Sequence, residues 1–224
     1  MALAGQLREF AATSSLRNVR RYRLNPDEMR SPQISSEKAR LEEAGANIAQ
    51  AIRSLKQSGK FDDLLLSMAK IIPGLHDIDV ATVGRYVTLR FQQRQSGDDI
   101  ADFNATEMSE GALRALGIFV ATLQMMPDEL LIVEEPEVSI HSGAANLIFD
   151  VLREAASRGA VLVTTHSADL LDAARDEEIL VCQYSEGVTK IGRLASAQRE
   201  VVKEGLFSLA ELLRSEPLRI DSDE

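Results

Sequence analysis

Two adjacent glutamates, Glu134 and Glu135, end an uninterrupted apolar run at residues 130–133. An apolar run without alternation predicts a strand buried on both faces, as in a parallel sheet that is covered by helices. Carboxylates at the end of such a strand lie at the rim where α/β sheets bind ligands, and carboxylate oxygen is what a hard cation prefers. The same residues also fit a core strand that leaves the sheet through a solvated acidic turn.

Two further stretches carry groups of chemical interest. Residues 108–114 are Met-Ser-Glu-Gly-Ala-Leu-Arg, and residues 164–167 are Thr-Thr-His-Ser. Ser109 stands where a helical pattern begins, and unpaired backbone N–H groups together with the helix dipole favour an anion at such a place. Considered alone, Ser109 is a plain helix cap and His166 is a structural residue at a strand end. Ser167 can cap a short helix that runs to Leu171.

The spacing of apolar residues predicts the elements that position these groups. From residue 109 onward helices and buried strands alternate, which implies a parallel α/β sheet with right-handed crossovers. The expected elements are a helix at 109–126, a strand at 130–134, a helix at 142–157, a strand at 160–164, a short helix from 167 to 171, two closing strands at 179–184 and 188–191, and an amphipathic helix at 198–214.

The earlier part of the chain predicts an attached lobe of helices and antiparallel strands. Apolar spacing gives one helix from Ser36 to Ser58 and a second from Phe61 to Ile72. An antiparallel hairpin with a tight turn at Gly84-Arg85 follows, and the polar residues 92–106 predict a loop.

Residues 1–33 are expected to be irregular and contain a basic cluster. Its members are Arg17, Arg20, Arg21, Arg23 and Arg30. These arginines either pair with the many acids at a solvated edge or contact phosphates, and the first alternative is favoured. The domain division expected is a lobe at 1–107, a core at 108–195 and a C-terminal helix and tail at 196–224.

The amino-acid composition limits the kinds of protein that this chain can be. The 224 residues carry a net charge of −10, which argues against a surface that binds nucleic acid everywhere, although a local basic patch could still do so. No apolar run approaches the length of a membrane span, and no signal peptide is recognisable. A single cysteine excludes an internal disulfide and fits a reducing compartment, so a cytoplasmic location is expected.

The four stretches, in this order and spacing, resemble the motifs of an ABC-type ATPase head of the SMC-, RecF- and OLD-like class. Residues 108–114 are similar to the signature, 130–137 to Walker B, 139–141 to the D-loop and 164–167 to the H-loop. The resemblance spans roughly residues 100–195. It implies the C-terminal part of a P-loop NTPase, an α/β fold with a parallel sheet and a helical and antiparallel lobe.

The resemblance also implies roles for individual residues. Glu134 would hold Mg²⁺, and Glu135 would be the general base that orients the attacking water. His166 would donate a hydrogen bond to the γ-phosphate of ATP. Four more residues would contact nucleotide, either at the start of the signature helix or on the segment that crosses to an opposing subunit. They are Ser109, Gly111, Ser139 and His141.

The sequence departs from the family pattern in several places. The signature has Ser-Glu-Gly where Ser-Gly-Gly is commoner, Ala112 replaces the usual Gln, and the first Walker B acid is Glu instead of Asp. Ser142 follows His141 where Pro is frequent. No stretch of the form G-x-x-x-x-G-K followed by Ser or Thr is present, and Gly59-Lys60 lacks the upstream glycine.

We therefore expect Mg²⁺-dependent ATP binding and hydrolysis by the C-terminal half of such a head, with ATP and Mg²⁺ as cofactors. The P-loop would come from a missing or separate N-terminal part, and the chain alone would be inactive. The expected partner is a second copy or a P-loop-bearing half, with DNA as a further candidate and no membrane, in DNA maintenance or anti-phage defence. The alternative is a non-catalytic interaction and dimerisation module that retains the scaffold.

Overall fold

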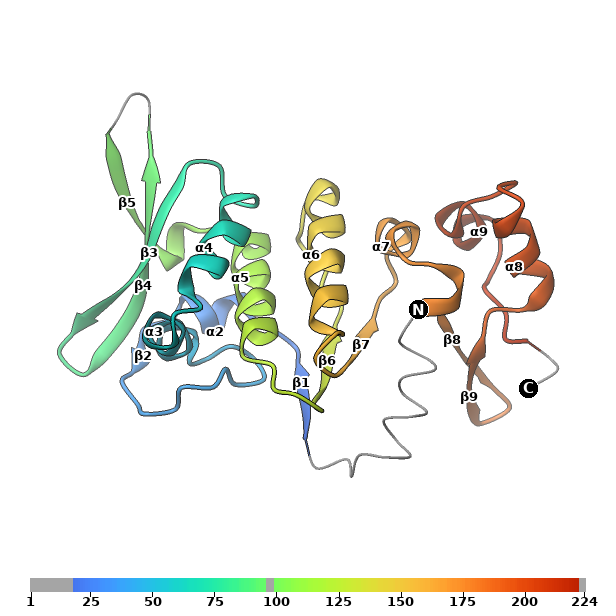
Figure 1. Cartoon of the computed structure of the whole chain (residues 1–224), viewed down its shortest axis with the longest axis horizontal. Helices are drawn as coiled ribbons and strands as arrows, with labels where there is room; N and C mark the ends of the chain where they lie inside the picture. The colour runs from blue at the N-terminus through green and yellow to red at the C-terminus, as the bar shows by residue number, and fades with distance from the viewer. Residues whose placement is uncertain (1–17, 96–98, 222–224) are drawn as a thin grey trace. The chain divides into compact units, whose positions relative to one another are not determined.

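The computed structural model describes residues 18–95 and 99–221 (Figure 1). Its residues fall into two compact units, 18–164 and 165–221, which are treated separately. The division into domains that the sequence predicts, with boundaries at residues 107/108 and 195/196, stays a prediction. No helix within the described residues is both long and apolar enough to cross a bilayer.

A parallel sheet forms the base of the first unit. It contains β1 (Val19–Tyr22), β6 (Leu130–Glu134) and β7 (Ala160–Thr164) in the order β1-β6-β7. The register pairs Tyr22 with Val133 and Glu134 with Thr164, so the carboxyl ends of the three strands meet at one edge. The two buried strands and their parallel arrangement were predicted from the apolar runs, and the structure confirms them.

Two helices accompany this sheet, α5 (Glu110–Leu123) and α6 (Ser142–Ala155). Figure 1 shows them side by side above β6 and β7, in the layered arrangement that a crossover produces. Nearly all residues of α5 are buried, from Gly111 to Thr122 except Arg114. A helix that is apolar almost all round belongs in an interior, and α5 is therefore the central helix of the unit.

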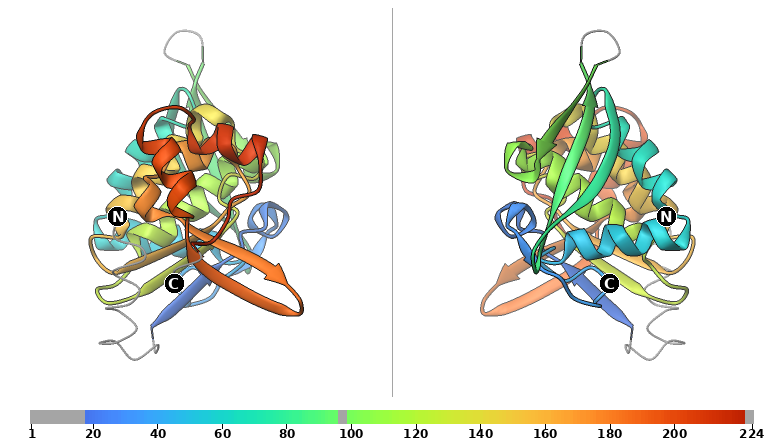
Figure 2. Two further views of the ribbon diagram at one scale, coloured as in Figure 1. Left: turned by 90° about the vertical axis from the view of Figure 1, so that its right-hand side faces the viewer. Right: turned by 90° about the vertical axis from the view of Figure 1, so that its left-hand side faces the viewer.

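The attached lobe contains an antiparallel sheet with the order β2-β4-β3, and β5 pairs with β4 (Figure 2, right). Its elements are β2 (Gln33–Ile34), α3 (Ile48–Ser58), α4 (Phe61–Ala69), β3 (Leu75–Val83), β4 (Tyr86–Arg94), β5 (Ile100–Asn104) and the 3-10 turn η1 (Ala105–Glu107). The hairpin turn at Gly84 and the presence of two helices agree with the sequence predictions, although the first helix begins later than predicted.

Two local predictions for the lobe were wrong. The loop expected at 92–106 is largely β4 and β5, whose polar residues pair across the strands, as when Gln92 Nε2 donates to Asp102 Oδ1 at 3.1 Å. The helix expected from Ser36 begins only at Ile48, because the Asn47 side chain holds residues 38–42 as a loop.

Residues 18–34 are also more regular than expected. They form β1, the helix α2 (Pro26–Arg30) and β2. The strand β1 escaped prediction because it is an edge strand whose first three residues are exposed, and only Tyr22 is buried.

The second unit contains α7 (Ala168–Ala173), η2 (Asp176–Glu178), the hairpin β8 (Leu180–Ser185) with β9 (Val188–Arg193), and the helices α8 (Ser196–Lys203) and α9 (Leu209–Ser215) (Figure 2, left). A small core of Ile179, Val181, Leu194 and Leu209 holds it together. The single helix expected at 198–214 is divided, since Gly205 takes a left-handed φ of 70° and Ser208 caps a new helix.

Candidate functional site

Glu134 is the last residue of β6 and lies at the carboxyl edge of the parallel sheet. Its side chain is 28% exposed and faces two guanidinium groups from the end of β1. Arg21 Nη1 lies 3.5 Å from Oε1, and Arg23 Nε lies 3.8 Å from Oε2. These separations exceed those of a direct charge-assisted hydrogen bond, so the pairs can exchange with water or with another ligand.

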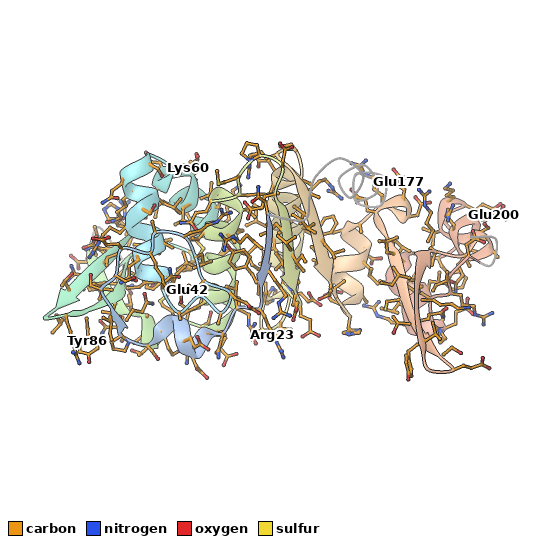
Figure 3. The ribbon with its side chains drawn as sticks, turned by 90° about the horizontal axis from the view of Figure 1, so that it is seen from below. Arg23, Glu42, Lys60, Tyr86, Glu177 and Glu200 are labelled. Carbon is orange, nitrogen blue, oxygen red and sulfur yellow. The ribbon has the colours of Figure 1, made fainter. Side chains whose placement is uncertain are left out.

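Three members of the basic cluster, Arg21, Arg23 and Arg30, pair with acids, which was the favoured alternative. Arg21 also contacts Glu43, and Arg30 lies 3.5 Å from Asp27. Figure 3 shows Arg23 just beyond the end of β1. Arg17 lies outside the described residues, and contact between the cluster and phosphates remains a prediction.

Glu135 follows directly and is exposed, with its backbone in the left-handed region at φ 45°. Its N–H donates to the carbonyl of Thr164 at 2.9 Å, which anchors it to the end of β7. Its own carbonyl accepts from Val138 N at 3.2 Å, and the chain turns away from the sheet there. A left-handed non-glycine residue costs about 1–3 kcal/mol and persists only where its surroundings fix it, which is frequent at functional sites.

The turn after Glu135 ends at α6. Ser139 is also left-handed, with φ 62°, and its hydroxyl donates to Glu110 Oε2 at 3.1 Å. His141 caps α6 because its Nδ1 accepts from Gly143 N at 3.1 Å. Contact of Ser139 and His141 with nucleotide remains a prediction.

The start of α5 lies against this turn. Ser109 caps the helix, as its type and position predicted, and its Oγ accepts from Ala112 N at 3.2 Å. A Cβ added to Gly111 would lie 2.2 Å from the carbonyl oxygen of Ser139. The Ser139 carbonyl therefore occupies the space next to the Gly111 Cα, where a side chain would otherwise lie. Contact of an anion with the helix start, and with Gly111, stays a prediction.

His166 belongs to the second unit, where it is exposed and lies two residues beyond the last residue of β7. The next residue, Ser167, caps α7 by accepting from Leu170 N at 3.4 Å, as the sequence predicted. The structure thus places six predicted site residues in the first unit and His166 at the beginning of the second. The hydrogen bond from His166 to a phosphate stays a prediction.

Sequence reasoning missed several partners of these residues. Glu110 was noted only as a departure from the commoner signature, yet it binds Ser139. Arg114, in the same motif, donates from Nη1 to the carbonyl of Leu24 at 2.7 Å, which ties α5 to the segment after β1. A charged residue within a helix that is otherwise buried was the available signal for this contact.

A buried ion pair supports the opposite end of β6. Glu129 is 2% exposed, pairs with Arg40 and accepts from Met126 N at 2.9 Å. Nearby, the Tyr22 hydroxyl donates to the carbonyl of Leu41 at 3.4 Å, and burial raises the pKa of this phenol. Together these contacts fix the loop at residues 38–43 beside β1.

A cavity of about 640 Å³ lies along the outer edge of β1 and is lined by residues 19–22 and 38–43. Neither Glu134 nor Glu135 lines it. Several of its charged side chains are already paired, since Lys38 Nζ lies 2.8 Å from Glu42 Oε1 and Arg40 contacts Glu129. The two glutamates therefore lie outside the lining of this cavity, although Arg21 both lines the cavity and pairs with Glu134.

The side chains at the carboxyl edge of the parallel sheet offer few ligands to a metal ion. No group of three or more His, Cys, Asp or Glu side chains that could hold a metal ion exists within residues 18–95 and 99–221. Glu134 offers one carboxylate, and its arginine contacts are long enough to exchange. A single carboxylate is compatible with a Mg²⁺ site in which water and phosphate oxygens supply most ligands, and Mg²⁺ at Glu134 stays a prediction.

Comparison with known proteins gives one family match. A family model described as "AAA domain, putative AbiEii toxin, Type IV TA system" matches residues 10–172, which is more than half of the chain. No curated protein matches the sequence.

Among solved structures, a chain from work on "ATP-driven dimerization and DNA stimulated activation of SMC ATPases" is 14% identical, with a TM-score of 0.48 over 71% of this chain and 95% of that one. The Smc head domain with a coiled coil and joint from Pyrococcus yayanosii is 15% identical, with a TM-score of 0.47 over 70% of this chain and 31% of that one. The SMC head domain from Thermotoga maritima is 14% identical, with a TM-score of 0.44 over 66% and 51%. This chain thus spans about half or less of the last two structures.

Proposed function

Because the chain belongs to the family of AAA domains described as putative AbiEii toxin, Type IV TA system, we propose that it supplies one half of an ATP-binding and ATP-hydrolysing site. The observation that carries the proposal is the pair Glu134 and Glu135 at the carboxyl edge of β6, with the first turn of α5 in contact with the segment that follows them. That edge is where α/β sheets bind ligands.

Glu135 is the general base of the proposed reaction. It is exposed, and its backbone is fixed to the end of β7, so its carboxylate can accept a proton from a water molecule that it also orients. Glu134 would contribute a carboxylate oxygen to Mg²⁺, and the bound metal would neutralise charge on the phosphate oxygens.

The start of α5 contacts a nucleotide that another subunit presents. The N–H of Ala112 is bonded to the Ser109 hydroxyl, whereas helix geometry leaves those of Glu110 and Gly111 without an intrahelical acceptor. Together with the helix dipole, these two groups favour an anion. In this proposal His166 donates a hydrogen bond to the γ-phosphate, and Ser139 and His141 lie on the segment that crosses to the opposing subunit. The P-loop is supplied by a partner or by a segment other than residues 1–224.

The assembled enzyme is a dimer, or a complex with a P-loop-bearing half, in DNA maintenance or anti-phage defence. The family description, which refers to a toxin–antitoxin system, supports a defence role. DNA is a second candidate partner.

A non-catalytic interaction module is the second candidate function, and two observations favour it. Glu134 is charge-balanced by arginines without a metal, and the Glu110 carboxylate at the start of α5 repels an anion. In such a module the same turn and helix serve only to form a dimer.

The two functions are separated by searching the coding sequences that adjoin this one for a P-loop, co-expressing the chain with any such neighbour and measuring ATP turnover. We expect Mg²⁺-dependent turnover that Glu135→Gln abolishes while ATP binding remains. The control Glu186→Gln changes an exposed carboxylate in the β8–β9 turn and should leave turnover intact. Full activity of the Glu135→Gln complex would remove Glu135 from the mechanism, and a stable but inactive wild-type complex would favour the interaction module.

A further inference from the structure

The turn at residues 135–140 contains two strained residues, one near each end. Glu135 and Ser139 both adopt left-handed backbone conformations, with φ values of 45° and 62°, and neither is glycine. Such conformations are kept only where other contacts determine them. The position of the Glu135 carboxylate therefore depends on whatever holds this turn.

Contacts within the turn and with the sheet account for part of that restraint. Val138 N donates to the Glu135 carbonyl at 3.2 Å, and Ile140 N donates to the Glu137 carbonyl at 3.0 Å. The Glu135 N–H is fixed to Thr164. None of these bonds involves Ser139, the second strained residue.

Ser139 is held by α5. Its hydroxyl donates to Glu110 Oε2 at 3.1 Å, and its carbonyl oxygen lies against Gly111 so closely that no Cβ would fit. Two consecutive residues of α5 thus contact Ser139. Glu110 accepts a hydrogen bond from its hydroxyl, and Gly111, which has no side chain, lets its carbonyl approach the helix backbone. The two partners are 29 residues apart in sequence.

We propose that Glu110 is a positioning residue, which acts through Ser139 to set the orientation of Glu135. Glu110 and Ser139 are both exposed, so loss of their hydrogen bond should loosen the turn locally without unfolding the unit. The hydrogen bond therefore acts mainly by fixing the backbone conformation of the turn at residues 135–140. Glu110 does not touch the reacting atoms in this scheme.

A regulatory consequence follows, and this part rests on the proposed function. Ser109 and Glu110 share the first turn of α5, so an anion bound at that helix start lies next to the Glu110 carboxylate and repels it. Movement of Glu110 loosens Ser139 and, through the turn, Glu135. The contact couples the nucleotide that the α5 start meets to the nucleotide that Glu135 serves.

The contact itself is tested in the isolated chain, without nucleotide, by hydrogen–deuterium exchange of peptides covering residues 136–143. Glu110→Ala and Ser139→Ala should each speed exchange there by about threefold to tenfold, and the double variant should add little to either single variant. Glu110→Gln keeps an acceptor oxygen and should remain near the wild type. The matched control is Asp62→Ala, an acid in the first turn of α4.

A further variant separates strain from the hydrogen bond. Ser139→Gly removes the hydroxyl but makes the left-handed backbone unstrained. Exchange in Ser139→Gly should therefore rise less than in Ser139→Ala. Unchanged exchange in both alanine variants, or effects that add as if independent, would overturn the proposed contact.

The positioning role is tested in the assembled complex by the effect on turnover. Glu110→Ala and Glu110→Gln both remove the charge at the start of α5, but only Glu110→Gln keeps an acceptor for Ser139, so kcat in Glu110→Ala should be about tenfold below that in Glu110→Gln, with similar KM values for ATP in the two variants. An unchanged kcat in a complex whose exchange has changed would refute positioning of Glu135. If the complex lacks ATPase activity altogether, the proposed function fails, while the exchange experiment still decides whether Glu110 holds the turn.

Discussion

Replacing Gly111 with alanine should destabilise the first unit, although the same change in most helices stabilises. A Cβ at this position would lie 2.2 Å from the Ser139 carbonyl oxygen, 3.1 Å from its carbonyl carbon and 3.2 Å from Ile140 Cα. All three atoms are backbone, so relief requires the whole turn or the helix to move. Such overpacking costs about 1–3 kcal/mol, and occasionally more.

The stability that alanine adds through its higher helix propensity is smaller than this overpacking cost. Alanine is favoured over glycine in a helix interior by about 1 kcal/mol, and by less in a first turn. The expected net loss is therefore about 1–2 kcal/mol in the free energy of unfolding. Urea unfolding of the purified chain, followed by circular dichroism with the same m-value for variant and wild type, measures it directly.

Gly143→Ala is the matched control for this substitution. Gly143 lies in the first turn of α6, and an added Cβ there would have its nearest contact at 3.4 Å, with His141 Nδ1, which is ordinary van der Waals contact. This variant should be as stable as the wild type or up to about 1 kcal/mol more stable. If Gly111→Ala proved no less stable than Gly143→Ala, α5 and the turn would not be in contact as described.

Other perturbations have equally definite outcomes. Arg40→Met leaves the buried Glu129 carboxylate without its charge partner and should cost about 3–5 kcal/mol in urea unfolding, whereas Glu129→Gln should cost less because Arg40 is 29% exposed and can be hydrated; equal losses would contradict this. The backbone hydrogen bond from Val80, assisted by Lys56, lowers the pKa of Asp79, so its contribution to stability is present above pH 3.8 and is lost as pH falls through the depressed folded-state pKa. The stability difference between wild type and Asp79→Asn should therefore be below about 1 kcal/mol at neutral pH, since the side chain is half exposed, and should shrink below pH 3.8; a difference that grows in acid would refute the assignment. Replacing Arg21 and Arg23 with Gln should leave any DNA affinity in a filter-binding assay unchanged, because both already pair with acids; a large loss with a steep salt dependence would identify them as phosphate contacts.

The parts of the fold that depend on local pattern were predictable from sequence. The buried strands β6 and β7 follow from uninterrupted apolar runs, and Ser109 and Ser167 were recognised as helix caps from their type and position. Hydrophobic burial and capping act over a few residues, so a short stretch of sequence contains the necessary information.

Edge strands and polar strands were not predictable in the same way. The strand β1 presents exposed arginines, and β5 alternates between exposed and half-buried residues, so neither shows the apolar signal of a core strand. The partner of β1, which is β6, is more than 100 residues away in the chain, so tertiary pairing determined β1 against weak local preference. The strand β5 follows its partner β4 directly, but its polar composition concealed the pairing.

The candidate site, too, was only partly predictable from the sequence. The glutamates and the helix start were identified from their order in the sequence, but the contacts that hold them were not. Ser139 meets Glu110 across 29 residues, and Arg40 meets Glu129 across 89. Such contacts depend on how the helices pack, and no spacing rule in the sequence encodes them.

The central claim is that this chain offers the carboxylates and the helix start of an ATP site but no phosphate cradle. ATP binds P-loop proteins chiefly through a ring of backbone N–H groups and a lysine, and the sequence contains no such motif. The carboxylates that remain repel a polyanion in the absence of a cradle. Titration of the purified chain with Mg-ATP in a calorimeter tests the claim most directly. It should show at best very weak binding, with no measurable hydrolysis in a parallel phosphate-release assay, whereas micromolar binding by the chain alone would contradict the account.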